Sequence, residues 1–191
     1  MSLILILTGK TASGKDTIIS NILQKYPAFK KVLTTTSRTP RQGEKNGVDY
    51  LFLSEDEFRK KVQNKEFLEY VEYGGNLYGT EKSQFLSNTQ NLIWKIDPSR
   101  AGSVRELLGD AKLLVIYINT DDETILQRLR MRGLSSVEIE KRMQDDKSIW
   151  EQYRNNYDYV LENTPGKLDK TMDKIITILD TQGLAPSGLS D

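Results

Sequence analysis

The sequence predicts an α/β fold built on a central parallel sheet of about five strands. Short apolar runs of strand length alternate along the chain with stretches that carry apolar residues at helical spacing. That order is typical of β-α-β units, which pack helices on both faces of a parallel sheet. The first apolar run also leads directly into a glycine-rich loop and a helical pattern. One stretch, 34–80, breaks the alternation and predicts a small β-rich lobe inserted into the sheet domain.

The individual elements follow from apolar periodicity. Continuous apolar runs are typical of strands buried on both faces of a parallel sheet. The predicted strands are 3–7, a segment ending near 32–33, 92–96, 113–118 and, from a weaker pattern, 159–161. The predicted helices lie around 16–26, 98–108, 121–131, 136–154 and 168–181. Within the lobe, we expect a short helix capped by Ser54 and Glu57 and a strand pair around Gly74-Gly75.

The loop after the first strand has the spacing of a phosphate-binding P-loop. Gly9 is followed five residues later by Gly14 and then by Lys15. Backbone N–H groups and the positive end of the next helix can hold a triphosphate there, while the lysine reaches its outer phosphates. The alternative is an ordinary strand–turn–helix whose glycines serve only the turn. The expected nucleotide-binding residues of the loop are Gly9, Lys10, Thr11, Ala12, Ser13, Gly14, Lys15, Asp16 and Thr17.

One position of this loop departs from the usual pattern. After the lysine the motif expects Ser or Thr, whose hydroxyl ligates the magnesium of the nucleotide. This chain has Asp16, with Thr17 one residue further on. Because hard cations prefer oxygen ligands, Asp16 could hold Mg²⁺ directly or through water. Asp16 is therefore the candidate metal ligand, and the geometry of the metal stays open.

Composition excludes several chemistries. The 191 residues include no cysteine, which rules out a thiol nucleophile, a disulfide framework and a cysteine-ligated zinc. They include no histidine, which rules out the Ser-His-Asp triad. Phosphoryl transfer remains, since it depends mainly on positioning and on cationic stabilisation.

Net charge and hydropathy limit the classes of binding partner and the location that we expect for this chain. The 27 basic and 27 acidic residues cancel, so we expect no nucleic-acid or anionic-membrane partner. The longest apolar runs are too short to span a bilayer. The first residues enter the first predicted strand without a basic region or a cleavage site, so we expect no secretory signal and a cytoplasmic location.

Two strings inside the predicted lobe carry a resemblance. TTTSRTPRQGEKNGVDY (34–50) and EFLEYVEYGGNLYGT (66–80) resemble the guanylate kinase family, and the likeness runs from Leu3 to about Leu179. The resemblance implies ATP- and magnesium-dependent phosphorylation of GMP, and of dGMP, by direct transfer. It implies one domain, 1–182, followed by a flexible tail, 183–191. Its parts would be a core (1–33, 81–124 and 150–182), a GMP-binding lobe (34–80) and a helical lid (125–149).

The lobe residues suit a guanine nucleotide chemically. Forked guanidinium donors match the dianionic phosphate of a monophosphate, and tyrosine hydroxyls can add donors. One carboxylate can accept from both N1–H and the 2-amino group of guanine, which suits Glu69, and a threonine can donate to O6. Adenine reverses that edge and would leave buried groups unpaired. The resemblance assigns Arg38, Arg41, Tyr50 and Tyr78 to the phosphate, and Thr34, Glu69, Thr80 and Asp97 to the base or its surroundings. The alternative is a solvated loop face.

The lid is predicted from a second arginine cluster. Arg128 and Arg132 lie four residues apart, on one face of a helix. The resemblance places them with Arg142 in a lid that closes over the phosphates, where arginines stabilise the charge of the transferred group. Together with Lys15 they are the catalytic candidates, and Gly133 could permit a break between two lid helices. Asn163 is placed near the adenine by the resemblance. The alternative for these arginines is a charged, exposed helix.

A second departure lies at Lys95, where many family members carry an acidic residue. Lys95 could form an ion pair with Asp16, so that the two unusual residues are one coupled change. Two other interpretations of the chain stay open. One is a non-catalytic guanylate-kinase-like module that binds proteins, although no protein partner is evident. The other is a kinase of a different nucleoside monophosphate.

Overall fold

The computed structural model describes residues 2–73, 75–86 and 90–186 and divides into two compact units. The larger unit comprises Leu3–Lys30 and Asn91–Asp191, and the smaller one comprises Lys31–Gln90 with the first two residues. The smaller unit contains the whole of the predicted lobe.

The larger unit is built on a five-stranded sheet with the order β2-β7-β1-β8-β9. In this sheet β1 pairs in parallel with β7 and β8, and β8 pairs in parallel with β9. The predicted parallel sheet is thus confirmed. The strands are β1 (Leu3–Gly9), β2 (Phe29–Val32), β7 (Asn91–Lys95), β8 (Lys112–Asn119) and β9 (Tyr159–Glu162), and the boundary between the two units falls within β2, after Lys30.

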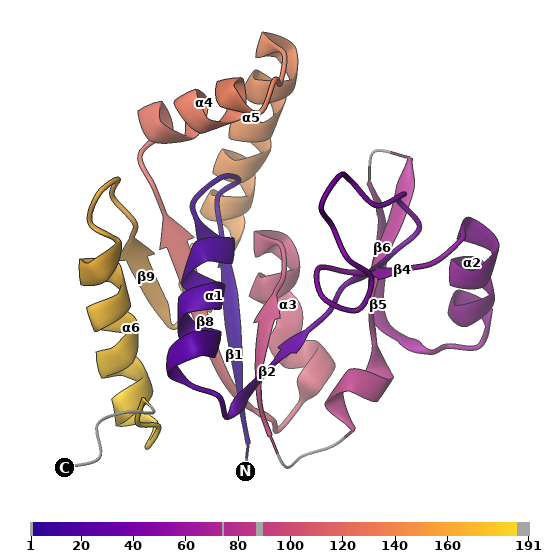
Figure 1. Ribbon diagram of the computed structural model, residues 1–191, viewed down its shortest axis with the longest axis horizontal. Helices are drawn as coiled ribbons and strands as arrows, with labels where there is room; N and C mark the ends of the chain where they lie inside the picture. Colours follow the sequence, from indigo (N-terminus) through magenta and orange to yellow (C-terminus); the bar gives the residue numbers. More distant parts are fainter. Residues whose placement is uncertain (1, 74, 87–89, 187–191) are drawn as a thin grey trace. The chain divides into compact units, whose positions relative to one another are not determined.

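Helices cover both faces of this sheet (Figure 1). Their bounds lie close to those predicted, because several begin at a clear sequence signal, such as the Asp97 cap of α3, the Asp121 cap of α4 or the Ser135 cap of α5. The helices are α1 (Lys15–Lys25), α3 (Pro98–Leu108), α4 (Asp122–Met131), α5 (Ser136–Tyr153) and α6 (Leu168–Thr181), and a 3₁₀ turn, η2, spans Arg154–Asn156.

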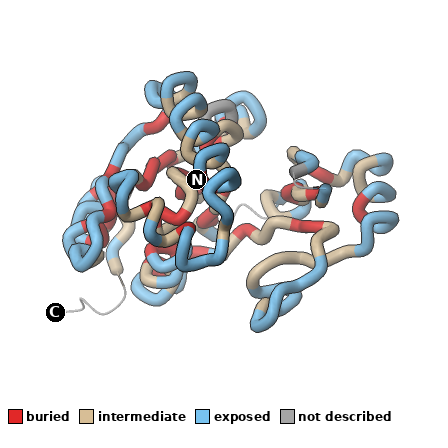
Figure 2. Tube along the Cα trace, turned by 90° about the horizontal axis from the view of Figure 1, so that it is seen from above, coloured by how far each residue is buried: buried red, intermediate tan, exposed pale blue. Residues whose placement is uncertain are grey.

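The core of the larger unit surrounds β1, all of whose residues are buried. Side chains on one face of β1, such as Leu5, pack with Ile18 of α1 and Ile175 of α6. On the other face, Tyr117 of β8 contacts the rings of Trp150 and Tyr157. Burial of each large apolar side chain contributes about 1.5–3 kcal/mol. Figure 2 shows buried segments of the chain inside the unit and exposed segments on the outer sides of its helices.

Helices α4 and α5 form a hairpin. Gly133, with φ of +78°, lies between them, as predicted. Ser135 then opens α5 with a capping box, in which it exchanges hydrogen bonds with Glu138. The hairpin has its own small core, and that core reaches the glycine-rich loop through Ala12. Its buried members are Ala12, Ile125, Leu129 and Ile139.

The smaller unit holds a four-stranded sheet with the order β4-β3-β6-β5. Ser54 and Glu57 form the predicted capping box of its helix. The core is formed by Phe58, Phe67 and Leu77, and the two phenylalanine rings stack with centroids 4.3 Å apart. The elements are β3 (Thr35–Thr36), β4 (Leu51–Phe52), α2 (Glu55–Gln63), β5 (Phe67–Tyr73), β6 (Asn76–Glu81) and η1 (Lys82–Phe85).

Two expectations fall partly outside the described residues. The predicted turn at Gly74-Gly75 includes Gly74, and the predicted tail includes 187–191. Of the rest of the tail, the N–H groups of Gly183 and Leu184 bond to carbonyls at the end of α6, and Leu184 packs against the core. These two residues therefore lie against the C-terminal end of α6 and the core.

Candidate active site

The glycine-rich loop needs both of its predicted glycines. Gly9 has φ of +139°, and a Cβ there would lie 2.1 Å from the carbonyl oxygen of Ile118. Gly14 has φ of +91°, and a Cβ there would lie 2.5 Å from Nδ2 of Asn163. L-residues with side chains rarely adopt such backbone angles. The spacing that predicted the loop thus reflects two positions where only glycine fits.

Lys15 lies over this loop and donates to it. Its Nζ bonds to the carbonyl oxygens of Gly9 at 2.9 Å and Lys10 at 2.7 Å, and to Oγ of Ser13 at 3.3 Å. Burial, and next the positive charge of Lys95, lower the pKa of Lys15 to about 8. The ammonium is therefore satisfied by the loop itself, in a position from which it can exchange those acceptors for phosphate oxygens.

Asn163 fixes the second half of the loop. Its Nδ2 donates to the carbonyl of Ser13 at 2.7 Å, and the buried hydroxyl of Thr120 donates to the same carbonyl at 3.3 Å. Asn163 follows β9 and is itself buried. Sequence reasoning placed Asn163 at the nucleotide but missed Thr120, which has no motif to mark it.

The predicted lid arginines do not all lie equally close to the loop. Nη1 of Arg128 donates to the carbonyl of Ala12 at 2.8 Å. Arg132 is the residue after α4, and its positive charge contributes to lowering the pKa of Lys15. Arg142 lies on α5 and is half-buried. Arg128 and Arg132 also line a pocket of about 310 Å³ beside the loop, with Ala12, Gly14, Thr17, Asn163, Thr164, Pro165, Gly166 and Leu168.

Two acidic residues that sequence reasoning missed also reach the loop. Oδ2 of Asp146, on α5, accepts the backbone N–H of Thr11 at 2.9 Å. Burial raises the pKa of Asp146, while the Thr11 N–H and the nearby Lys15 partly oppose that effect. At the start of α4, Asp122 pairs with Lys10 at 2.8 Å. In a helix pattern Asp146 is an ordinary polar position, so no signal in the sequence could have found it.

Asp16 and Lys95 form the ion pair that the sequence suggested. Nζ of Lys95 lies 2.6 Å from Oδ1 of Asp16. Asp16 stands in the first turn of α1, and Lys95 is the last residue of β7. The proposed metal ligand is thus held by an ammonium group from the neighbouring strand.

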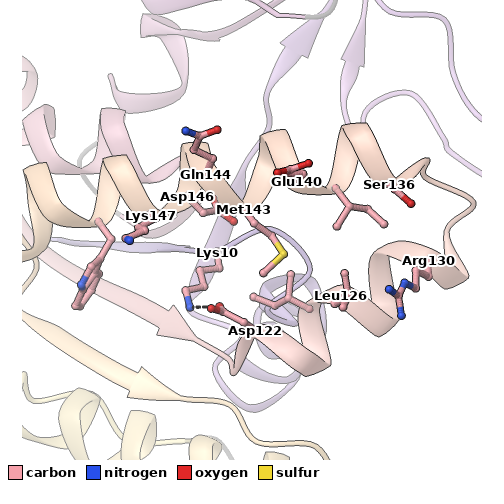
Figure 3. A pocket seen from close by; sticks show the side chains of 13 residues that line it. Lys10, Asp122, Leu126, Arg130, Ser136, Glu140, Met143, Gln144, Asp146 and Lys147 are labelled. Carbon is pink, nitrogen blue, oxygen red and sulfur yellow. Dashed lines mark hydrogen bonds and ion pairs between the residues drawn. The ribbon is translucent and has the colours of Figure 1, made fainter.

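A larger pocket, of about 720 Å³, lies between α4 and α5, and Lys10 of the loop contributes to its lining (Figure 3). That lining mixes apolar side chains of the hairpin, such as Leu126 and Met143, with scattered charges of both signs. The smaller pocket, in contrast, is lined by Gly14, Thr17 and Asn163. The smaller pocket is therefore the better candidate for the nucleotide, despite its volume.

In the smaller unit, Glu44 and the ring of Tyr50 lie around Arg38, one of the predicted phosphate-binding residues. Its Nη2 donates to both carboxylate oxygens of Glu44, at 2.8 and 2.9 Å, and its guanidinium lies 5.4 Å from the ring centre of Tyr50. Burial by itself lowers the pKa of Arg38, but the hydrogen bond to Glu44 and the charge of Glu44 outweigh burial, so the pKa of Arg38 is raised overall. Arg41 is exposed, and its backbone N–H bonds to Glu44. Tyr78 lies on β6, opposite Thr36. Glu44 is a partner that sequence reasoning missed.

The predicted base-binding residues Glu69 and Thr80 are cross-strand partners on β5 and β6. The hydroxyl of Thr80 donates to Oε1 of Glu69 at 2.7 Å. Thr34 is half-buried at the start of the unit, where its carbonyl accepts the N–H of Leu51. Asp97 belongs to the larger unit, where it caps α3 and is bonded by Ser99 and Arg100. Burial opposes the ionisation of Asp97, but the charge of Arg100 and these bonds outweigh it, so the pKa of Asp97 is lowered.

The larger unit thus gathers cations around the glycine-rich loop. Lys15, Arg128 and Arg132 can surround a polyphosphate, and such groups stabilise charge that spreads over a transferred phosphoryl group. The smaller unit pairs one carboxylate with one hydroxyl donor and holds a partly buried arginine.

No helix in the described part of the chain has both the length and the apolar character needed to cross a membrane.

Comparison with known proteins agrees with this chemistry. A family model described as guanylate kinase matches residues 1–182. A guanylate kinase from Symbiobacterium thermophilum is 35% identical over 164 residues, which cover 84% of this chain and 77% of the relative. A guanylate kinase from Wolbachia sp. subsp. Brugia malayi is 32% identical over 97% of this chain and 96% of the relative.

Two further matches differ in length or in identity. A protein from Oryza sativa subsp. japonica named guanylate kinase 2, chloroplastic/mitochondrial, is 28% identical, and the chain spans 64% of its length. The crystal structure of guanylate kinase from Anaplasma phagocytophilum has the same fold, with a TM-score of 0.71 and 24% identity over 98% of this chain and 91% of that one. Because the family model matches residues 1–182, nearly the whole of the 191-residue chain, this chain belongs to the guanylate kinase family.

Proposed function

We propose that this protein transfers the γ-phosphoryl group of ATP to GMP, and also to dGMP, producing ADP and the corresponding diphosphate. The observation that carries the proposal is the contact between Arg128 and the loop carbonyl of Ala12, at 2.8 Å. It brings a lid arginine to the same loop as Lys15. Phosphoryl transfer requires a loop that holds the triphosphate and, beside that loop, an arginine that stabilises the charge of the transferred group.

The donor half of the site would lie in the larger unit. The loop N–H groups and the start of α1 bind the triphosphate of ATP, and Lys15 moves from the loop carbonyls to the outer phosphates. Arg128, Arg132 and Arg142 stabilise the charge of the transferred group and exclude water. The pocket beside Asn163 takes the adenosine part of the nucleotide.

The acceptor half would lie in the smaller unit. The phosphate of GMP is bound by Arg38, Arg41, Tyr50 and Tyr78. Its negative charge takes the place of the Glu44 carboxylate beside Arg38. Glu69 accepts from N1–H and the 2-amino group of guanine, and Thr80 or Thr34 donates to O6. The resemblance also assigns Asp97, which caps α3 in the larger unit, to the surroundings of the base.

Magnesium would enter with the nucleotide, where it supplies positive charge to the phosphates. The chain's own donor set does not fit a magnesium ion held by the protein, because Asp16 is paired with Lys95. Among the described residues there is also no group of three or more acidic side chains that could hold a metal ion. We also propose that the protein carries out this reaction in the cytoplasm.

Two other functions make different predictions. A protein-binding module would need neither the loop lysine nor the lid arginines, whereas this chain keeps Lys15, Arg128 and Arg132 around one loop. A kinase for another monophosphate would need a different hydrogen-bonding edge opposite the base. The Glu69–Thr80 pair offers an acceptor beside a donor, which matches the edge of guanine.

A coupled assay of ADP release, with ATP, Mg²⁺ and a panel of nucleoside monophosphates, separates the three. We expect the highest kcat/KM with GMP, followed by dGMP, and little turnover with AMP, CMP or UMP. Binding of GMP without turnover would support the module. Preference for another base would support the different kinase and remove guanine from the proposal.

A further inference from the structure

Lys95 is a cation of the phosphate site that the family pattern does not include. It ends β7 opposite Leu7 of β1, at the carboxyl end of the strands, which is where ligands bind in parallel α/β sheets. Its Nζ lies 2.6 Å from Oδ1 of Asp16. The side chain of Lys95 is 31% exposed, against 77% for Asp16, so the ammonium is the more enclosed partner.

The charge of Lys95 also acts on Lys15. After burial, it is the strongest influence that lowers the pKa of Lys15 to about 8. Two ammonium groups therefore face the same loop, where they repel one another in the ligand-free protein. A polyphosphate between them would turn that repulsion into attraction, since an opposite charge favours the charged form of each group.

The two carboxylates that act on Lys15, those of Asp16 and Asp146, are already engaged, and so is Asp97, two residues after Lys95. Asp16 pairs with Lys95 itself, Asp97 accepts from Ser99 and Arg100, and Asp146 accepts the N–H of Thr11. Magnesium usually binds through one or two carboxylates together with substrate phosphates and water. In this chain, the ammonium group of Lys95 occupies the position beside Asp16, the carboxylate that follows Lys15.

We propose that Lys95 binds the triphosphate of ATP and supplies positive charge that a divalent cation supplies elsewhere, so that this protein binds ATP with little dependence on Mg²⁺. Asp16 holds the Lys95 ammonium when no nucleotide is bound, and phosphate oxygens replace Asp16 on binding. This inference rests on the proposed function, since it takes ATP as the ligand of the loop.

The test is the dissociation constant of ATP, measured by calorimetry without GMP, once in MgCl₂ and once in EDTA. For the unsubstituted protein, we expect the two values to agree within about threefold, a difference of less than one tenfold step in affinity. Lys95→Met should weaken binding at least about tenfold in EDTA and much less in MgCl₂, because the added cation replaces the lost charge. Lys95→Arg should retain binding in EDTA.

Lys112→Met is the matched control, since Lys112 is an exposed lysine of β8 that bonds to the carbonyl of Gln182. It should leave both constants unchanged. The proposal is overturned if the unsubstituted protein needs Mg²⁺ to bind ATP, or if Lys95→Met has no effect in EDTA. An equal loss in both buffers would also overturn it, because that result indicates a structural role.

Turnover distinguishes this inference from the proposed function. If ATP binds equally with and without Mg²⁺ but no monophosphate is phosphorylated, the proposed function fails while the role of Lys95 in binding triphosphate stands. If GMP is phosphorylated but ATP binding requires Mg²⁺, the role of Lys95 fails while the proposed function stands.

Discussion

The glycine-rich loop of the larger unit and the proposed GMP-binding residues of the smaller unit hold their polar groups in different ways. Around the loop, Lys15, Arg128 and Asn163 all donate to backbone carbonyls. In the smaller unit, Arg38 and Thr80 donate to the carboxylates of Glu44 and Glu69. The first arrangement depends on the path of the main chain, and the second depends on the identity of individual side chains.

This difference predicts how each region responds to substitution. A change that moves the main chain of the loop should affect stability and every phosphate contact together. A change to one side chain of the smaller unit should alter recognition of GMP and leave the fold intact. The two regions can therefore be tested separately.

The largest effect is expected for Gly9→Ala. The new Cβ would lie 2.1 Å from the carbonyl oxygen of Ile118, at φ of +139°. Backbone strain of this kind costs about 1–3 kcal/mol, and the clash with main-chain atoms adds to it. We expect urea denaturation to show a loss of at least about 3 kcal/mol in the free energy of unfolding.

Gly43→Ala is the control, since Gly43 has φ of +88° but no atom within 4 Å of the new Cβ. Only the conformational cost of about 1–2 kcal/mol should remain. Equal losses in the two variants would mean that close packing does not set the path of the loop.

Glu69→Gln should have the largest effect on recognition. The amide nitrogen would face a guanine donor, and a lost hydrogen bond to a charged group costs about 1.5–3 kcal/mol. We expect kcat/KM for GMP to fall by about tenfold to a hundredfold, with an unchanged thermal midpoint. Glu72→Gln, on the same strand but exposed, should be neutral. Unchanged GMP kinetics in Glu69→Gln would remove this residue from the base pocket.

Arg38→Lys should have a smaller effect. The planar guanidinium lies over the rings of Tyr50 and Phe52, and an ammonium cannot reproduce either that packing or the forked donors. We expect the KM for GMP to rise about tenfold while the KM for ATP stays constant. Arg59→Lys is the control, because Arg59 forms an exposed ion pair with Glu55 on α2. A parallel rise in the KM for ATP would argue against a role confined to GMP.

The smallest effect is expected for Asp146→Asn, and it should depend on pH. Burial raises the pKa of Asp146 above its value in the unfolded chain. A carboxyl group with a raised pKa stabilises the fold at low pH and loses that contribution as pH rises through its folded pKa. The amide introduced by this substitution would keep an acceptor for the Thr11 N–H without the charge.

The variant should therefore be more stable than the unsubstituted protein at pH 7, and its advantage should shrink as the pH falls toward about 4, near the ordinary pKa of an aspartate. Urea denaturation across that range measures the difference. A constant difference at all pH values would show that the Asp146 carboxyl group does not change its ionisation within the range.

The two regions also differ in how far the sequence predicts them. The glycine spacing located the loop together with the apolar strand before it and the helical pattern after it, and Gly9 and Gly14 adopt backbone angles that other residues rarely adopt. Sequence patterns also located each helix of the larger unit and the capping box of α2, since caps and apolar periodicity are local signals. The two-residue strands β3 and β4 were missed, because two residues carry no period.

The side-chain partners could not be predicted in the same way. Asp146 and Thr11 are 135 residues apart, and Thr120 and Ser13 are 107 apart, so no spacing connects them. Glu44 lies near Arg38 in sequence, but the pattern gives no reason to pair this carboxylate with Arg38 rather than with Arg41. The Lys95–Asp16 pair was predicted because two departures from one family pattern pointed to each other.

The hydrogen bond between Asp146 and the N–H of Thr11 has a consequence for the lid. It connects α5 to the main chain of the loop, so a nucleotide that takes this N–H must release the helix. Binding free energy and helix position are then linked, and the link is reciprocal. A second ligand that binds better when α5 is released would raise the affinity for ATP, and ATP would raise the affinity for that ligand by the same factor.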